Sequence, residues 1–184
     1  MKKRQTHALV FMALCIVLNI VIGNLVLMLK LPVYLDSVGT ILAASLLGPL
    51  PGMLVGGSTG VIIGVTSDIF SLFFMPVQLI TAAVTGLLFR KSVLANPASC
   101  WWQALIISLP GTIVSTVITI SIFHGITSSG SSLIVQLLTG IGMNQAFAVF
   151  IVQVATDYLD RLLSILLVSL TLRIGGKRLS SLWQ

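Results

Sequence analysis

Long apolar runs alternate with short polar or helix-breaking stretches along this chain, a pattern typical of a helical bundle in a membrane. Crossing a hydrocarbon core of about 30 Å takes about 20 apolar residues. Runs of near-spanning length predict six helices over about 7–29, 37–47, 53–67, 72–89, 101–123 and 144–172. A short apolar piece over 133–141 precedes the last helix. We therefore expect one all-α membrane domain covering residues 1–184, with six transmembrane helices.

The second apolar run, 37–47, is too short to cross a bilayer alone, since it gives only about 16 Å of helix. It stops at the helix-breaking sequence Gly48-Pro-Leu-Pro-Gly52. Its lead-in, 31–36, must then enter the membrane region as irregular backbone. Such backbone is tolerated in lipid only where protein shelters it, usually beside a cavity. The lead-in is thus the first indication of a binding site.

The third run carries glycine at every fourth position, at Gly52, Gly56, Gly60 and Gly64. Four-residue steps place these glycines on one stripe of a helix, and small residues let membrane helices approach closely. We interpret the stripe as tight packing inside the bundle. Packing against another protein is the second interpretation, and homodimerisation through this stripe is the third.

Composition and charge support a membrane protein with both termini in the cytoplasm. Hydrophobic residues make up 57% of the chain and charged residues only 8%, too few to cover a soluble domain. Lysines and arginines cluster at segment ends rather than along one face, which does not indicate nucleic-acid binding. With six spans, Lys30 alone lies at an outer end, and the positive-inside rule places the eight Lys and Arg residues at the other ends in the cytoplasm. These are Lys2, Lys3, Arg4, Arg90, Lys91, Arg173, Lys177 and Arg178.

No enzymatic chemistry is visible in the sequence. It contains no HExxH or GxxxxGK[ST] motif, and no Ser-His-Asp arrangement or carboxylate pair with a nearby general acid is evident. Cys15 and Cys100 are far apart and have no metal-ligand spacing, so we expect neither a metal nor an intrinsic cofactor. A bundle without its own energy source suggests a binding subunit powered by other proteins. A stand-alone facilitator and a structural membrane protein are the alternatives.

Charged residues in membrane segments need a reason for being there. Asp157 and Arg161, four residues apart, are interpreted as a neutralised pair that fixes helix packing, with contact to a substrate or partner as the alternative. Asp36 suits the start of the second helix as a cap. The candidate substrate-binding residues gather on the predicted outer side. They are Tyr34, Asp36, Asp68, His124, Asn144 and Gln145.

The stretch LPVYLDSVGTILAASLLGPLPGMLVGGSTG, positions 31–60, resembles the substrate-binding S components of energy-coupling factor (ECF) transporters, which are bacterial vitamin importers. The resemblance implies a six-helix S-component bundle in the bacterial plasma membrane. Such a subunit captures a vitamin from outside and docks on a transmembrane T component that two cytosolic ATPases drive. It is then thought to topple in the membrane and release the vitamin inside.

The family's Ala-x-x-x-Ala docking motif on the first helix is absent here, because Met12 follows Ala8 and Val17 follows Ala13 at that spacing. The nearest stripe of smaller side chains is Cys15, Asn19 and Gly23. The docking surface predicted from the resemblance therefore comprises Ala8, Met12, Cys15, Asn19 and Gly23.

The outer mouth has no cluster of Arg or Lys, which argues against a small anion as the only ligand. Apolar walls with Asn, Gln, Ser and Tyr suit a large neutral, amide-rich ligand. The overall likeness favours cobalamin (vitamin B12). Riboflavin, pantothenate and a pyrimidine vitamin precursor stay open.

Overall fold

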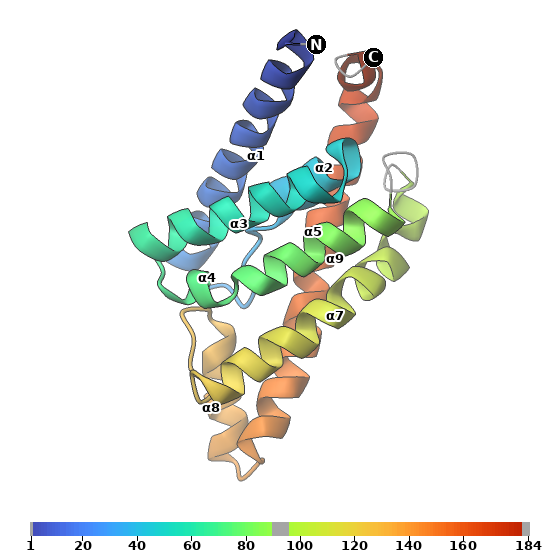
Figure 1. Ribbon diagram of the computed structural model, residues 1–184. Helices are drawn as coiled ribbons and strands as arrows, with labels where there is room; N and C mark the ends of the chain where they lie inside the picture. The colour runs from blue at the N-terminus through green and yellow to red at the C-terminus, as the bar shows by residue number, and fades with distance from the viewer. Residues whose placement is uncertain (1, 90–95, 182–184) are drawn as a thin grey trace.

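The computed structural model describes residues 2–89 and 96–181, apart from the side chains of 2–4, 97 and 176–181. The described residues form helices and loops, without any β-strand (Figure 1). In chain order, the elements are α1 (Lys2–Met28), α2 (Val38–Leu47), α3 (Pro49–Thr66), α4 (Phe70–Phe73), α5 (Met75–Leu88), η1 (Pro97–Ser99), α7 (Cys100–Ser121), α8 (Ser131–Gly140) and α9 (Gln145–Ser181).

Neighbouring helices pack in the order α3, α5, α7 and α9, while α1 and α2 pack together and against α3. The start of α1 and the end of α9 lie at one end of the bundle (Figure 1). The α8 helix and the start of α9 form the opposite end. The loop 29–37 leaves the far end of α1 and returns the chain into the bundle as α2.

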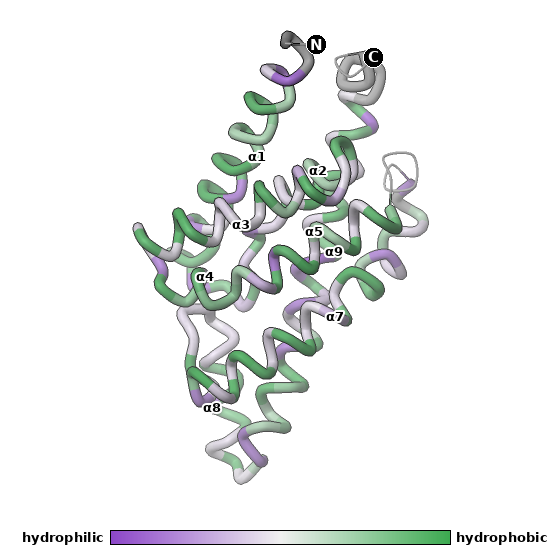
Figure 2. The backbone as a smooth tube through the Cα atoms, viewed as in Figure 1, coloured by the Kyte–Doolittle hydropathy of each residue, from purple (hydrophilic) through white to green (hydrophobic). Residues whose placement is uncertain are grey.

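Three helices are long and apolar enough to cross a membrane: α1 over Gln5–Met28, α3 over Pro49–Thr66 and α7 over Cys100–Ser121. Hydrophobic positions dominate these helices (Figure 2). Large apolar side chains also point away from the protein, including Leu14, Val65 and Ile113, each more than half exposed. Apolar surface on this scale is typical of a protein in contact with lipid.

Helix lengths vary widely: besides the short helices α4 and α8, α2 and α5 are shorter than a bilayer, and α9 is longer. The 10 residues of α2 and the 14 of α5 cannot cross a core of about 30 Å unaided. The 37 residues of α9 form a helix of about 55 Å, so part of it extends beyond such a core. Asp157, Asp160 and Arg161 interrupt the apolar sequence of α9 near its middle.

The predicted helix boundaries differ from the structure at several ends: α1 begins five residues earlier than predicted, α9 continues nine residues further, and proline changes the boundaries of α3 and α5. The α3 helix begins at Pro49 rather than near 53, because proline in the first turn has no N–H to leave unsatisfied. The turn before it is reduced to Gly48, whose φ of +100° favours glycine. The helix predicted over 72–89 is divided at Phe74 into α4 and α5, with Pro76 in the first turn of α5. Pro110 lies inside a continuous α7.

The glycine stripe of α3 lies where this helix meets α2, α4 and α5. A Cβ built on Gly52 would lie 2.5 Å from the Cβ of Ala44, and one on Gly64 would lie 2.8 Å from the Cβ of Leu72. Built on Gly56 and Gly60, it would come within 3.4 Å of α2, α4 or α5 atoms. The four-residue spacing therefore serves packing inside the chain.

A buried asparagine joins the first three helices. The Asn19 side chain accepts a hydrogen bond from the Gly39 N–H at 2.6 Å and donates to the hydroxyls of Thr40 and Thr59 at 3.0 and 3.1 Å. Gly39 has no side chain because a Cβ there would collide with the carbonyl oxygen of Cys15. The side of α1 that carries Asn19 is thus a packing surface.

The docking surface predicted on α1 is mostly interior in this conformation. Cys15, Asn19 and Gly23 are buried, and a Cβ on Gly23 would lie 3.1 Å from the Cβ of Asp36. Because these side chains are small, α2 and the loop that precedes it pack closely against α1. This face of α1 is therefore not open to a partner protein. Ala8 and Met12, closer to the start of α1, are half-buried.

The close approach of α3 to α2 can be tested with two glycines on one helix. We expect Gly52→Ala to lower the free energy of unfolding by about 1 to 3 kcal/mol, because its Cβ would overlap Ala44. Gly57→Ala is the matched control, since its Cβ would meet only Leu79 Cδ2, at 3.5 Å. Thermal unfolding of the detergent-purified variants measures both. Equal stability of the two variants would contradict the packing described here.

Candidate functional site

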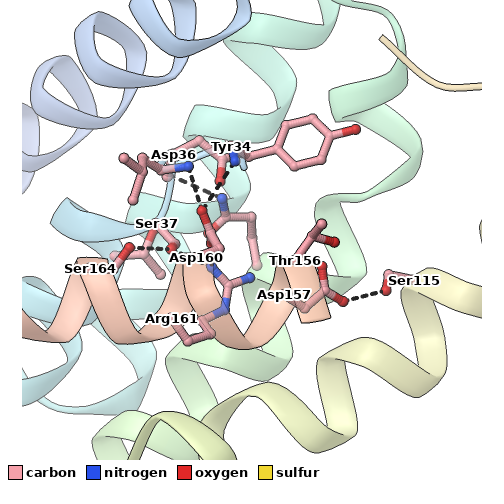
Figure 3. A network of polar contacts seen from close by, with 12 residues as sticks. Tyr34, Asp36, Ser37, Ser115, Thr156, Asp157, Asp160, Arg161 and Ser164 are labelled. Atoms are coloured by element: carbon pink, nitrogen blue, oxygen red, sulfur yellow. Dashed lines mark hydrogen bonds and ion pairs between the residues drawn. The ribbon is translucent and has the colours of Figure 1, made fainter. Parts of the chain in front are cut away.

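The irregular loop 29–37 is held in the bundle by one carboxylate on α9. Oδ1 of Asp160 accepts hydrogen bonds from the backbone N–H groups of Leu35 at 2.6 Å and Tyr34 at 3.2 Å (Figure 3). Leu35 has a φ of +49°, a conformation uncommon for residues other than glycine. Because buried backbone groups need partners, Asp160 stabilises the loop in a shape that it would not adopt alone.

Arg161 completes this anchor. Its Nη1 lies 2.5 Å from Oδ2 of Asp160, and it also donates to the hydroxyl of Ser37, the residue that precedes α2. Ser37 lies 3.4 Å from Ser164, one turn further along α9. The guanidinium therefore links α9 to the start of α2 and neutralises the carboxylate that holds the loop.

The prediction that Arg161 pairs with Asp157 is wrong. The ion pair joins Arg161 to the adjacent Asp160, whereas Asp157 accepts a hydrogen bond from Ser115 of α7 at 2.8 Å (Figure 3). Asp36 likewise is not the helix cap that the sequence suggested, since Ser37 occupies that position. The Asp36 carboxylate instead faces the same interior space as Asp157.

This space is a small cavity between the loop 29–37, α4, α5, α7 and α9, and most of the residues that line it are polar. Its volume is about 40 Å³, room for only a few water molecules. A larger ligand can enter only if the surrounding loops move. The lining residues are Tyr34, Asp36, Ser71, Phe74, Val77, Gln78, Ser115, Gln153, Asp157, Asp160 and Arg161.

Burial changes the acid–base properties of the two loop residues in the cavity. Loss of hydration, with a smaller contribution from the nearby Asp160 carboxylate, raises the pKa of Asp36 to about 6. Loss of hydration also raises the pKa of Tyr34 to about 12. The tyrosine is therefore a neutral hydrogen-bonding group at neutral pH, while Asp36 titrates close to the physiological range.

The loop 29–37, which contributes Tyr34 and Asp36 to the cavity lining, is joined to the loop 122–130. The Tyr34 hydroxyl donates to Thr127 at 3.3 Å, and the Gly130 N–H donates to the Leu31 carbonyl at 3.3 Å. Ser128 donates to Asp68 at 2.7 Å and so ties the loop 122–130 to the end of α3. We call the loops 29–37 and 122–130 the cover.

An aromatic cluster lies beneath the cover. Phe123 packs against Phe70, Phe73 and Phe74 with ring centroids 4.7 to 6.0 Å apart. The cover is thus held by a few hydrogen bonds and by ring contacts rather than by a continuous helix. Segments joined in this way can open without disrupting the bundle.

The structure separates the predicted substrate-binding residues into three places. Tyr34 and Asp36 line the cavity, and Asp68 holds the cover. Asn144 accepts hydrogen bonds from the first N–H groups of α9, and the Gln145 side chain donates to the His124 carbonyl. The last three residues therefore lie at the α8 end of the bundle, and none of them lines the cavity.

Gln78, Ser115 and Gln153 were not predicted to be binding residues. Asp157 was predicted to fix helix packing, with contact to a substrate or partner as the alternative. Gln78 and Gln153 are amides within apolar helices, so their isolation was an available signal. Ser115 gave no such signal in the sequence, because the hydroxyl of a serine in a membrane helix commonly donates a hydrogen bond to a backbone carbonyl of the same helix. Among the described residues, no group of three or more His, Cys, Asp or Glu side chains could hold a metal ion.

Comparisons with protein-family models, curated proteins and solved structures give no match. The functional interpretation therefore depends on the sequence and on the geometry of the cavity and its cover.

The loop anchor can be tested by removing its charge. We expect Asp160→Asn to lower the free energy of unfolding by about 3 to 5 kcal/mol, because it leaves Arg161 buried without an ion-pair partner. The variant should also increase amide hydrogen exchange in the loop 29–37. Ser164→Ala, which removes only the 3.4 Å contact with Ser37, is the control and should change stability by less than about 1 kcal/mol. Unchanged exchange in Asp160→Asn would show that another group holds the loop.

Proposed function

We propose that this chain is the substrate-binding S component of an ECF-type importer, a membrane subunit that captures a vitamin for ATP-driven uptake. The observation that carries this proposal is a small cavity within an apolar helical bundle, lined mostly by polar residues and bordered by the loop 29–37, which is joined to the loop 122–130. Concave sites that combine apolar walls with a few polar groups are typical of small-molecule binding.

The proposed orientation places the cover on the outer side of a bacterial plasma membrane. In this arrangement the chain crosses six times, with the short helices α2 and α5 completed by their neighbours and by sheltered loop. Both termini face the cytoplasm, in agreement with the excess of Lys and Arg near them. The loop 29–37, at the far end of α1, then faces the exterior, where the substrate arrives.

In this proposal the energy for import comes from other subunits. The sequence has no phosphate-binding GxxxxGK[ST] loop, so ATP hydrolysis is assigned to two cytosolic ATPases acting through a transmembrane T component. The small residues of α1 that the family would use for docking are largely interior in this conformation. Ala8 and Met12 are therefore the first residues to test for contact with the T component.

Cobalamin is the substrate that the overall sequence likeness favours, with riboflavin, pantothenate and a pyrimidine vitamin precursor as alternatives. Any of them requires the cover to open, because the cavity is about 40 Å³ as it stands. A stand-alone facilitator or a structural membrane protein is the competing class.

Binding and transport separate these classes. We expect the purified protein to bind one of the four vitamins in isothermal titration. We expect liposomes to accumulate that vitamin only when the T component, both ATPases and ATP are also present. Uptake by this chain alone would identify a facilitator. Absence of binding to all four compounds, with the protein shown to be folded, would contradict the proposal.

Closure of the cover can be tested at Gly130. A Cβ there would overlap the Lys30 carbonyl group, so Gly130→Val should keep the two loops apart. We expect the bound vitamin to dissociate at least tenfold faster from this variant. Gly140→Val is the matched control, since a Cβ at Gly140 has no atom within 4 Å. Equal dissociation rates would show that these loops do not retain the ligand.

A further inference from the structure

The acidic residues of the chain are concentrated at the cavity. The sequence has ten Lys and Arg residues but only four acidic ones, and three of those four, Asp36, Asp157 and Asp160, line this space. The only cation in the lining is Arg161, which is already paired with Asp160 and bonded to Ser37. The lining therefore has an excess of negative charge in a chain whose net charge is +6.

A buried amide gives a second, independent indication. Gln78 of α5 is 4% exposed and lines the cavity, and its Oε1 has no hydrogen-bond partner among the described residues. Its Nε2 donates to the Asp36 carbonyl at 3.1 Å. Rotating the amide by 180° would turn Oε1 toward that carbonyl, which can only accept. The orientation is therefore determined, and a buried acceptor is left for a donor that the described residues do not supply.

Aromatic side chains form an adjacent wall. The rings of Tyr34 and Phe74 both line the cavity, with centroids 6.4 Å apart. The Tyr34 hydroxyl is bonded to Thr127 in the cover, so the ring's position depends on cover closure. Aromatic faces attract cations and pack against flat heteroaromatic rings.

From these three observations we propose that the cavity binds the cationic or N–H-donating end of a small organic ligand, such as an amine, an amidine or an amino-substituted heteroaromatic ring. In this arrangement Gln78 Oε1 and the carboxylates of Asp36 and Asp157 accept its hydrogen bonds, and Tyr34 and Phe74 flank it. The inference rests on the proposed function and narrows the class of its substrate. Among the four candidate compounds it favours the pyrimidine vitamin precursor, if that precursor carries an amino group, and disfavours the pantothenate anion.

Selectivity measurements on the full-length chain test this assignment. The probes are 4-amino-5-hydroxymethyl-2-methylpyrimidine, its analogue with hydrogen in place of the amino group, pantothenate, riboflavin and cobalamin. We expect the aminopyrimidine to bind at least tenfold more tightly than its analogue without the amino group. Gln78→Leu and Asp157→Asn should each reduce that ratio at least tenfold. The ratio of the two affinities is measured on folded protein, so a lower yield of folded variant does not change it. Asp157→Asn keeps the shape of the side chain and gives the affinity ratio if Gln78→Leu does not fold.

Gln136→Leu, a matched change on the exposed surface of α8, should leave the ratio unchanged. Tight binding of cobalamin, riboflavin or pantothenate without binding of the aminopyrimidine would overturn this inference but support vitamin capture. An unchanged ratio in both cavity variants would also overturn it. Failure of every probe to bind the folded protein would contradict the proposed function itself.

Discussion

The hydrogen bonds from the loop 29–37 to the Asp160 carboxylate are the interaction on which the rest of the site depends. Residues 29–32 of this loop are exposed, but Tyr34 and Leu35 are half-buried, and backbone N–H groups shielded from water need a partner from the protein. Asp160 supplies it for Tyr34 and Leu35, and Arg161 neutralises the charge that this introduces. As a result, Leu35 stays in its uncommon conformation while Tyr34 and Asp36, on either side of it, reach the cavity.

Close helix packing brings the other half of the site into position. Because Gly56 has no side chain, α3 can approach both Thr40 of α2 and Gln78 of α5. This contact places Gln78 within hydrogen-bonding distance of the Asp36 carbonyl. The glycine stripe and the cavity are therefore linked physically. The absence of a side chain at Gly56 lets α3 and α5 pack closely, and this packing determines that Gln78 meets Asp36.

The two loops of the cover differ in how firmly they are held. Asp160 and Arg161 fix the loop 29–37 to α9, whereas the loop 122–130 is held by hydrogen bonds to other loops and by the rings around Phe123. Local opening involves the least stable contacts of a protein. A ligand could therefore enter by displacing the loop 122–130 while the helices keep their arrangement, which is the behaviour that the proposed capture subunit requires.

Sequence alone determined the helices, because apolar runs, prolines and glycines act locally on the backbone. The runs predicted α1, α2, α7 and α8 closely, and the short second run correctly indicated sheltered irregular backbone beside a cavity. Partner choice was decided only by tertiary structure. Asp157 and Arg161 are separated by one helical turn, yet Asp157 bonds to Ser115 of α7, and Gln78 meets Asp36 from another helix. Spacing along one helix limits which side chains share a face, but packing between helices decides which of them meet.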